Sequence, residues 1–210
     1  MKSLLGLLLA IIFVPAVGQI NAVTDTGDEV LLYEDGTWEY VDGAEVEETE
    51  IPTNETPFEK DKKSTFLIKS KKLNIGLWIN PKEWSFEKGA EDDASEFKFV
   101  KKGEDLYGML ITEKIEVPLS TLKTIALENA KGVAPDTKVV HEEYRMVNGV
   151  KVLHMQLTGT LQGIRFTYLG YYYSSAEGSI QLVSYTADNL VQTYKKDIEI
   201  LLNGLVVLEE

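Results

Sequence analysis

Hydrophobic and polar residues alternate along most of the last two thirds of the chain, with the two-residue period of β-strands. The alternation predicts strands at 73–79, 95–100 and 106–115, and at about 137–147, 150–161, 164–174 and 179–186. In two places the period changes to that of an amphipathic helix. Pro118 begins the first helix and Gly132 is expected to end it, whereas Asp188 begins the second and Asn203-Gly204 ends it. Runs of strands interrupted by two helices predict an α+β fold with a central, mostly antiparallel sheet.

Two tight turns fix the expected register of the middle strands. Asn148-Gly149 has the composition of a two-residue type I′ turn, which places Glu143 opposite His154. Gln162-Gly163 provides a second such turn, which places His154 opposite Tyr171. Because successive side chains of a strand point to opposite faces, these three polar residues form a row on one face, and the other face is apolar.

The polar face brings together the only two histidines of the chain. His141 is diagonal to His154 in this register, and Glu143 is opposite His154. Two imidazoles and a carboxylate could bind a metal ion or transfer a proton. Facing strands also pair glutamate with histidine as an ordinary polar contact. We expect a polar or helix-covered face, and keep a metal site at His141, Glu143 and His154 as the alternative.

The first 22 residues have the composition of a secretory signal peptide. Lys2 supplies the positive start, residues 4–14 form an apolar run, and cleavage is expected after Gly18 or Ala22. The chain contains no cysteine, which excludes a lipid-bearing cysteine, disulfides and thiolate sites. We therefore expect an exported protein that is soluble in a periplasm or outside the cell, is not a lipoprotein, and has no membrane-spanning segment after cleavage.

The net charge of −13 is concentrated near the N-terminus. Residues 23–63 hold 14 acidic residues against three lysines, whereas residues 64–210 hold 20 acidic residues against 17 basic ones. Residues 42–63 combine acids, threonines and two prolines with few apolar residues, which predicts an acidic, flexible linker. The α+β domain at 64–210 is nearly neutral, so nucleic acid is not an expected partner.

A separate β-hairpin is predicted between the leader and the linker, at 23–41. In the stretch EVLLYEDGTWEYV, residues 29–41, Asp35-Gly36 is the expected two-residue turn. That turn pairs Tyr33 with Trp38 and places Tyr40 on the same face. An isolated hairpin is marginal in water, so this aromatic face is expected to be covered by the main domain, a second copy or an external ligand.

Three stretches of the chain resemble a known fold group. They are DLYGMLITEKIEVPLSTLKTIALEN, YRMVNGVKVLHMQLTG and GYYYSSAEGSIQLVSYTADNLVQTYKKDIEILLNGL. Their order resembles the PsbP-like group, which includes an extrinsic photosystem II protein, a Ran-binding nuclear transport factor and many uncharacterised bacterial exported proteins. The resemblance covers about residues 66–208 and implies an α/β/α sandwich that works by binding rather than catalysis. Residues 29–41 also resemble a short segment that follows the signal peptide in exported proteins of Bacteroidetes.

The motifs of common enzyme classes are absent from the sequence, including G-x-S-x-G, the P-loop, H-E-x-x-H and G-x-G-x-x-G. We therefore expect a non-catalytic exported protein that binds or helps assemble an envelope or extracellular component. Its expected partner is a protein of the envelope, and no cofactor is expected. Two alternatives stay open: glycan or small-ligand binding by Tyr33, Trp38 and Tyr40, and a metal-dependent enzyme with its site at His141, Glu143 and His154.

Overall fold

The computed structural model describes residues 20–23, 29–33, 36–41 and 50–208, which form two compact units divided after Glu50. Most of the predicted leader, Asp35 of the expected turn and residues 42–49 of the predicted linker lie outside the described residues. No helix in the described part of the chain is long and apolar enough to cross a bilayer.

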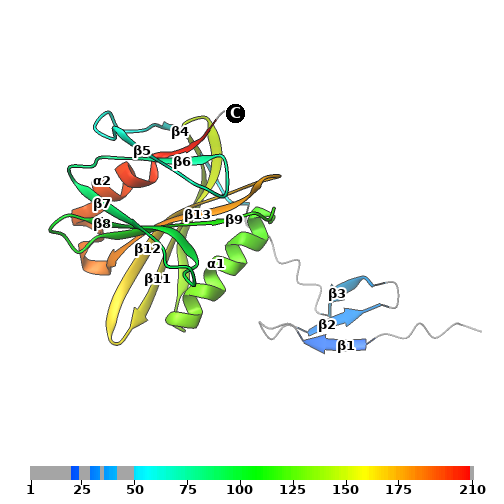
Figure 1. Cartoon of the computed structure of the whole chain (residues 1–210). Helices are drawn as coiled ribbons and strands as arrows, with labels where there is room; N and C mark the ends of the chain where they lie inside the picture. The colour runs from blue at the N-terminus through cyan, green and yellow to red at the C-terminus, as the bar shows by residue number, and fades with distance from the viewer. Residues whose placement is uncertain (1–19, 24–28, 34–35, 42–49, 209–210) are drawn as a thin grey trace, which may run out of the picture. The chain divides into compact units, whose positions relative to one another are not determined.

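The first unit contains a small antiparallel sheet rather than a two-stranded hairpin. Its strands are β1 (Ile20–Val23), β2 (Glu29–Leu32) and β3 (Trp38–Tyr40), in the order β1-β2-β3 (Figure 1). β1 crosses the end of the predicted leader. Cleavage after Gly18 would leave β1 whole, whereas cleavage after Ala22 would remove three of its four residues.

The predicted register of β2 and β3 is wrong by one residue. The Tyr33 amide donates to the Thr37 carbonyl at 2.8 Å, and Leu32 pairs with Trp38. The loop therefore contains three residues and ends at Gly36, whose φ of 85° favours glycine. Three-residue hairpin loops of this kind are common, and a change of one residue moves side chains to the opposite face.

The second unit is an α+β domain, as predicted. Its large sheet has the order β4-β10-β11-β12-β13-β9-β8-β7, and a smaller sheet has the order β14-β6-β5. All pairs are antiparallel except β4 with β10. The strands are β4 (Thr53–Phe58), β5 (Phe66–Lys69), β6 (Ile75–Ile79), β7 (Trp84–Lys88), β8 (Ser95–Lys101), β9 (Tyr107–Glu113), β10 (Lys138–Val147), β11 (Val150–Leu161), β12 (Ile164–Ser175), β13 (Gly178–Ala187) and β14 (Leu205–Val207).

The helices bury different faces of the large sheet. α1 (Leu119–Val133) packs through Leu122 and Ala126 against one core, while α2 (Val191–Leu202), which follows the short helix η1 (Asp188–Leu190), contributes to the other (Figure 1). The small sheet belongs to the α2-side core. Neighbouring residues Tyr171 and Tyr172 consequently enter different cores, as strand alternation requires. Both faces of the central strands are therefore buried.

The predicted register of the middle strands is confirmed. Glu143 is opposite His154, and His154 is opposite Tyr171. Both turns have the positive φ angles of type I′, with 47° at Asn148 and 51° at Gln162. The turn chemistry thus determines which side chains meet on the face beneath α2.

The linker predicted at 42–63 is wrong over its second half. Residues 51–63 belong to the α+β unit, and β4 pairs in parallel with β10 at the edge of the large sheet. Pro57 is tolerated there because an edge strand leaves one side of its backbone without ladder bonds. Composition alone does not distinguish this strand from a linker, because most of its side chains are exposed.

Asn148 does more than form a turn. Its Nδ2 donates to the carbonyls of Asn203 at 2.8 Å and Leu205 at 2.7 Å, and its Oδ1 accepts from the Lys60 amide at 2.9 Å. We expect Asn148→Gly, which tolerates the positive φ but loses these three bonds, to lower the free energy of unfolding by about 2 kcal/mol. Urea denaturation measures the change.

Gln162→Gly is the matched control, because it also places glycine at the first residue of a type I′ turn, but one where the side chain is exposed. Its free energy of unfolding should change by no more than about 0.5 kcal/mol. Equal losses in the two variants would show that turn geometry, rather than the Asn148 side chain, stabilises this corner.

Candidate functional site

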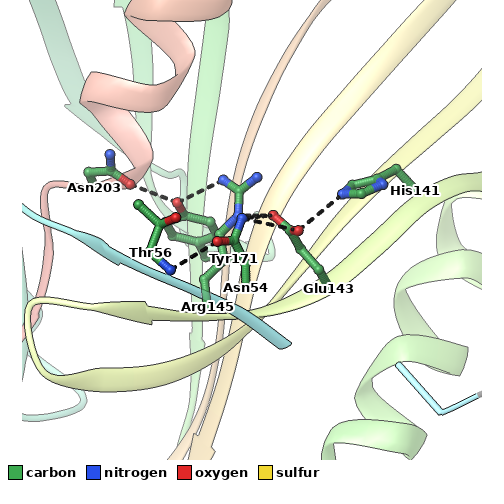
Figure 2. A network of polar contacts seen from close by, with 7 residues as sticks. All are labelled: Asn54, Thr56, His141, Glu143, Arg145, Tyr171 and Asn203. Atoms are coloured by element: carbon green, nitrogen blue, oxygen red, sulfur yellow. Dashed lines mark hydrogen bonds and ion pairs between the residues drawn. The ribbon is translucent and has the colours of Figure 1, made fainter. Parts of the chain in front are cut away.

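A group of polar side chains lies on the α2-facing side of β10, β11 and β12. We call it the polar cluster, and define it as Asn54, His141, Glu143, Arg145, His154, Tyr171 and Asn203. Figure 2 shows six of these residues, which come from β4, β10, β12 and the end of α2. His154 comes from β11. The cluster therefore joins segments that are far apart in the sequence.

An ion pair lies at the centre of the polar cluster. Arg145 Nε donates to Glu143 Oε1 at 2.5 Å, and the two side chains are only 12% and 13% exposed. The guanidinium also lies 4.5 Å from the centre of the Phe58 ring and donates through Nη1 to the Tyr171 hydroxyl at 3.2 Å. Arg145 is thus fixed by a carboxylate, a hydroxyl and an aromatic face.

Tyr171 connects the ion pair to the end of α2. Its hydroxyl donates to Asn203 Oδ1 at 2.7 Å while it accepts from Arg145, as the dashed lines of Figure 2 show. The residue is fully buried, and this burial raises the pKa of the Tyr171 phenol. Tyr171 is therefore a neutral hydrogen-bonding group at physiological pH.

Glu143 keeps its charge despite its burial. Burial opposes ionisation, but hydrogen bonds from Arg145 and Asn54 outweigh it and hold the pKa of the Glu143 carboxyl below its usual value. Asn54 Nδ2 lies 3.3 Å from each carboxylate oxygen. Asn54 lies in β4, so the strand that the sequence did not predict supplies one of the partners of Glu143.

His154 is a neutral imidazole in this setting. Only 3% of the residue is exposed, and burial, together with the charge of Arg145, lowers the pKa of His154 to about 3. Its ring centre is 5.7 Å from that of His141 and 5.7 Å from that of Tyr171. Its Nδ1 is buried and has no hydrogen-bond partner within the described residues.

The structure brings His141, Glu143 and His154 together, as the register predicts. One nitrogen of each histidine and one Glu143 oxygen lie within 4.8 Å of one another. A cavity of about 180 Å³ adjoins the two histidines and is lined also by Lys195, Ile198 and Glu199 of α2. The face is thus also covered by a helix, and the metal site at these three residues stays a prediction.

The aromatic residues of the first unit do not form the predicted face. Tyr33 donates through its hydroxyl to the carboxylate of Glu39, which identifies the face that those two side chains share. Trp38 is adjacent to Glu39 in β3 and therefore points to the opposite face, where 53% of it is exposed. Tyr40 pairs with Val30. Ligand binding by Tyr33, Trp38 and Tyr40 stays a prediction.

A second surface, which the sequence reasoning missed, lies on the α1 side of the sheet. Tyr107, Tyr185 and Tyr168 occupy directly paired positions of β9, β13 and β12, and we call them the tyrosine row. Neighbouring ring centres are 5.5 and 5.6 Å apart. All three residues are half-buried, and burial raises the pKa values of Tyr168 and Tyr185. Val100, which is 41% exposed, extends the row on β8.

An apolar cavity adjoins the tyrosine row. It has a volume of about 250 Å³ and lies between α1 and the sheet, with Val133, Met109 and Val183 among its walls. Tyr168 and Tyr172 contribute to the same lining. Tyr172 lies over Gly170, where an added Cβ would come within 2.9 Å of the tyrosine ring. The register could have identified the row, since each tyrosine is paired with the next.

No family model and no curated protein matches the chain. Among solved structures, PsbP (CyanoP) of the cyanobacterium Synechocystis is similar over 68% of this chain and 91% of its own length, with 12% identity and a TM-score of 0.54. The α+β unit has a PsbP-like fold. The fold predicted from the three stretches is therefore confirmed, whereas the resemblance of residues 29–41 to a Bacteroidetes segment stays a prediction.

Two other solved structures are similar to the PsbP-like domain at lower scores. LpqN, described as involved in cell envelope biogenesis of Mycobacterium tuberculosis, has 12% identity, covers 64% of this chain and 83% of its own length, and gives a TM-score of 0.46. A protein of unknown function from Pseudomonas aeruginosa has 11% identity, covers 69% and 98%, and gives 0.44. At these TM-scores the two similarities carry no argument about this chain.

Proposed function

We propose that this chain is an exported, non-catalytic protein whose PsbP-like domain binds another component of the cell envelope or the extracellular space. The observation that carries the proposal is the tyrosine row beside its apolar cavity. Partly exposed tyrosines present both apolar area and a polar hydroxyl, which is why tyrosine is enriched at recognition surfaces. The predicted leader supports export.

The chemistry of the polar cluster supports a non-catalytic function, because its groups are poorly suited to acid–base catalysis. A general acid or base works best when its pKa is near the operating pH. Hydrogen bonds hold the pKa of Glu143 below its usual value, burial lowers that of His154 to about 3, and burial raises that of Tyr171. Arg145 connects Glu143 to Tyr171, and Tyr171 binds Asn203, so these hydrogen bonds connect β10 and β12 to the end of α2.

Tyr185 is the central ring of the row, so its loss is the sharpest test of the proposal. We expect Tyr185→Ser to reduce recovery of the native envelope partner at least ten-fold, because both ring contacts of the row are lost. Tyr185→Phe should retain the partner, because the ring remains. The measurement is quantitative affinity capture from the native envelope with the full-length exported chain, with thermal unfolding of each variant recorded alongside.

Phe86→Ser is the matched control, because Phe86 is an aromatic residue of β7 that is 41% exposed. It should leave the captured partner unchanged. Trp38→Ser, measured in the same way, tests the alternative in which the first unit recognises the ligand. Unchanged capture by Tyr185→Ser, together with loss in Trp38→Ser, would overturn the role of the tyrosine row.

A further inference from the structure

We propose that His141, Glu143 and His154 form a binding site for a divalent transition metal of the zinc type. The donors are one nitrogen of each imidazole and one carboxylate oxygen, all within 4.8 Å of one another. The site is independent of the binding function proposed above. It lies on the α2 side of the sheet, whereas the tyrosine row lies on the α1 side.

The contact between His141 and Glu143 has the spacing of two ligands rather than of a hydrogen bond. His141 Nε2 is 3.7 Å from Glu143 Oε2, which is too long for a hydrogen bond. Two ligands of one tetrahedral zinc, with bonds of about 2.0–2.2 Å, lie roughly 3.3–3.5 Å apart. The His141 side chain is 49% exposed, so a small rotation can complete this approach without moving the core.

His154 supplies an independent indication of a missing ligand. Its Nδ1 is buried and has no hydrogen-bond partner within the described residues. A buried polar atom without a partner destabilises the folded state, and most such atoms in native proteins are paired. Coordination of a metal through Nδ1 would give this atom a partner, and the ring lies beside that of His141.

Arg145 and Asn54 contact the Glu143 carboxylate without belonging to the donor set. Arg145 Nε binds Glu143 Oε1, while Oε2 of the same carboxylate faces His141. The ion pair therefore orients the carboxylate, as hydrogen-bonded groups commonly orient metal ligands. The positive charge of Arg145, and of Lys195 at the adjacent cavity, opposes a divalent cation, so we expect micromolar rather than nanomolar affinity.

The donor set selects the kind of metal. Two imidazoles with one carboxylate suit Zn²⁺, Cu²⁺ or Co²⁺, whereas Ca²⁺ and Mg²⁺ prefer oxygen ligands. Three protein ligands leave a fourth position for water. The adjoining cavity of about 180 Å³ provides space for that water beside Glu199.

The site is tested by titrating Zn²⁺ and Co²⁺ into the full-length exported chain after treatment with a chelator. Calorimetry should show one equivalent of Zn²⁺, and Co²⁺ should give the intense visible absorption of a four- or five-coordinate ion. His141→Ala, Glu143→Gln and His154→Gln should each weaken binding at least ten-fold. His141 is exposed, so its variant separates loss of a ligand from loss of folding, which thermal unfolding checks.

Glu142→Gln is the control, because the adjacent Glu142 carboxylate binds Lys123 of α1 at 2.7 Å and is not part of the donor set. It should bind Zn²⁺ like the unsubstituted chain. Absence of stoichiometric Zn²⁺ and Co²⁺ binding would overturn the proposal. So would unchanged affinity in folded His141→Ala, because any binding would then occur elsewhere.

Discussion

Arg145→Met is expected to lower the free energy of unfolding by about 3 kcal/mol, because it removes one partner of a largely buried ion pair. The variant leaves the Glu143 carboxylate 13% exposed and without its cation. It also removes the guanidinium from the Phe58 ring and the hydrogen bond to the Tyr171 hydroxyl. Methionine retains most of the apolar length of the side chain, so the loss reports mainly on charge. Urea denaturation at pH 7 measures it.

A double-mutant cycle separates the ion pair from packing. Arg145→Met combined with Glu143→Gln should recover a large part of the loss, because no unpaired buried charge remains. A loss below about 1 kcal/mol for Arg145→Met, with no recovery in the double variant, would mean that the pair behaves like an exposed salt bridge.

The sequence predicted the candidate metal ligands because their placement depends on local turn chemistry. Asn-Gly and Gln-Gly at the two turns determine the register of β10, β11 and β12, and with it the meeting of Glu143, His154 and Tyr171. Each step spans a few residues and follows from the alternation of side chains. The pattern therefore contains enough information to build this part of the site.

The partners of those ligands could not be predicted in the same way. Asn54 reaches Glu143 through a parallel pairing of β4 and β10, across 89 positions of the sequence. Asn203 reaches Tyr171 from the end of α2. Neither contact leaves a periodic signal, because parallel pairing requires no local turn and a helix end has no fixed position over a sheet.

In the first unit, a local signal was present but its geometry was not unique. An Asp-Gly pair is compatible with a two-residue turn and with the three-residue loop observed at Gly36, and the two differ by one residue in register. That difference places the side chains of Tyr33 and Trp38 on opposite faces of the small sheet. A hydrophobic pattern on both faces of β2 gives no further information that would choose between the registers.

Glycine occurs at both predicted helix ends, but its surroundings differ between the two positions. Gly132 lies inside α1, one residue before its end, and an added Cβ there would meet nothing within 4 Å. Gly204 follows α2 without a positive φ, and an added Cβ would come within 2.1 Å of the Trp78 carbonyl oxygen. Close approach to β6, rather than the left-handed conformation of a helix cap, therefore requires glycine at position 204.

Gly204→Ala is accordingly expected to lower the free energy of unfolding by about 3 kcal/mol or more, because the clash is with backbone rather than a flexible side chain. The chain at Gly204 cannot move away easily. The Trp78 amide donates to the Gly204 carbonyl at 2.8 Å, and Asn148 binds the carbonyls on both sides. Relief of the clash would break the connection between α2, β14 and β6.

Gly132→Ala is the matched control for this prediction, since it adds the same methyl group to a helix with free space around it. It should raise the free energy of unfolding by about 0.5–1 kcal/mol, because alanine favours the helix more than glycine does. Urea denaturation under identical conditions should show changes of opposite sign in the free energy of unfolding of the two variants. A neutral Gly204→Ala variant would show that the α2–β14 connection adjusts to the methyl group, so that glycine there is not required by packing.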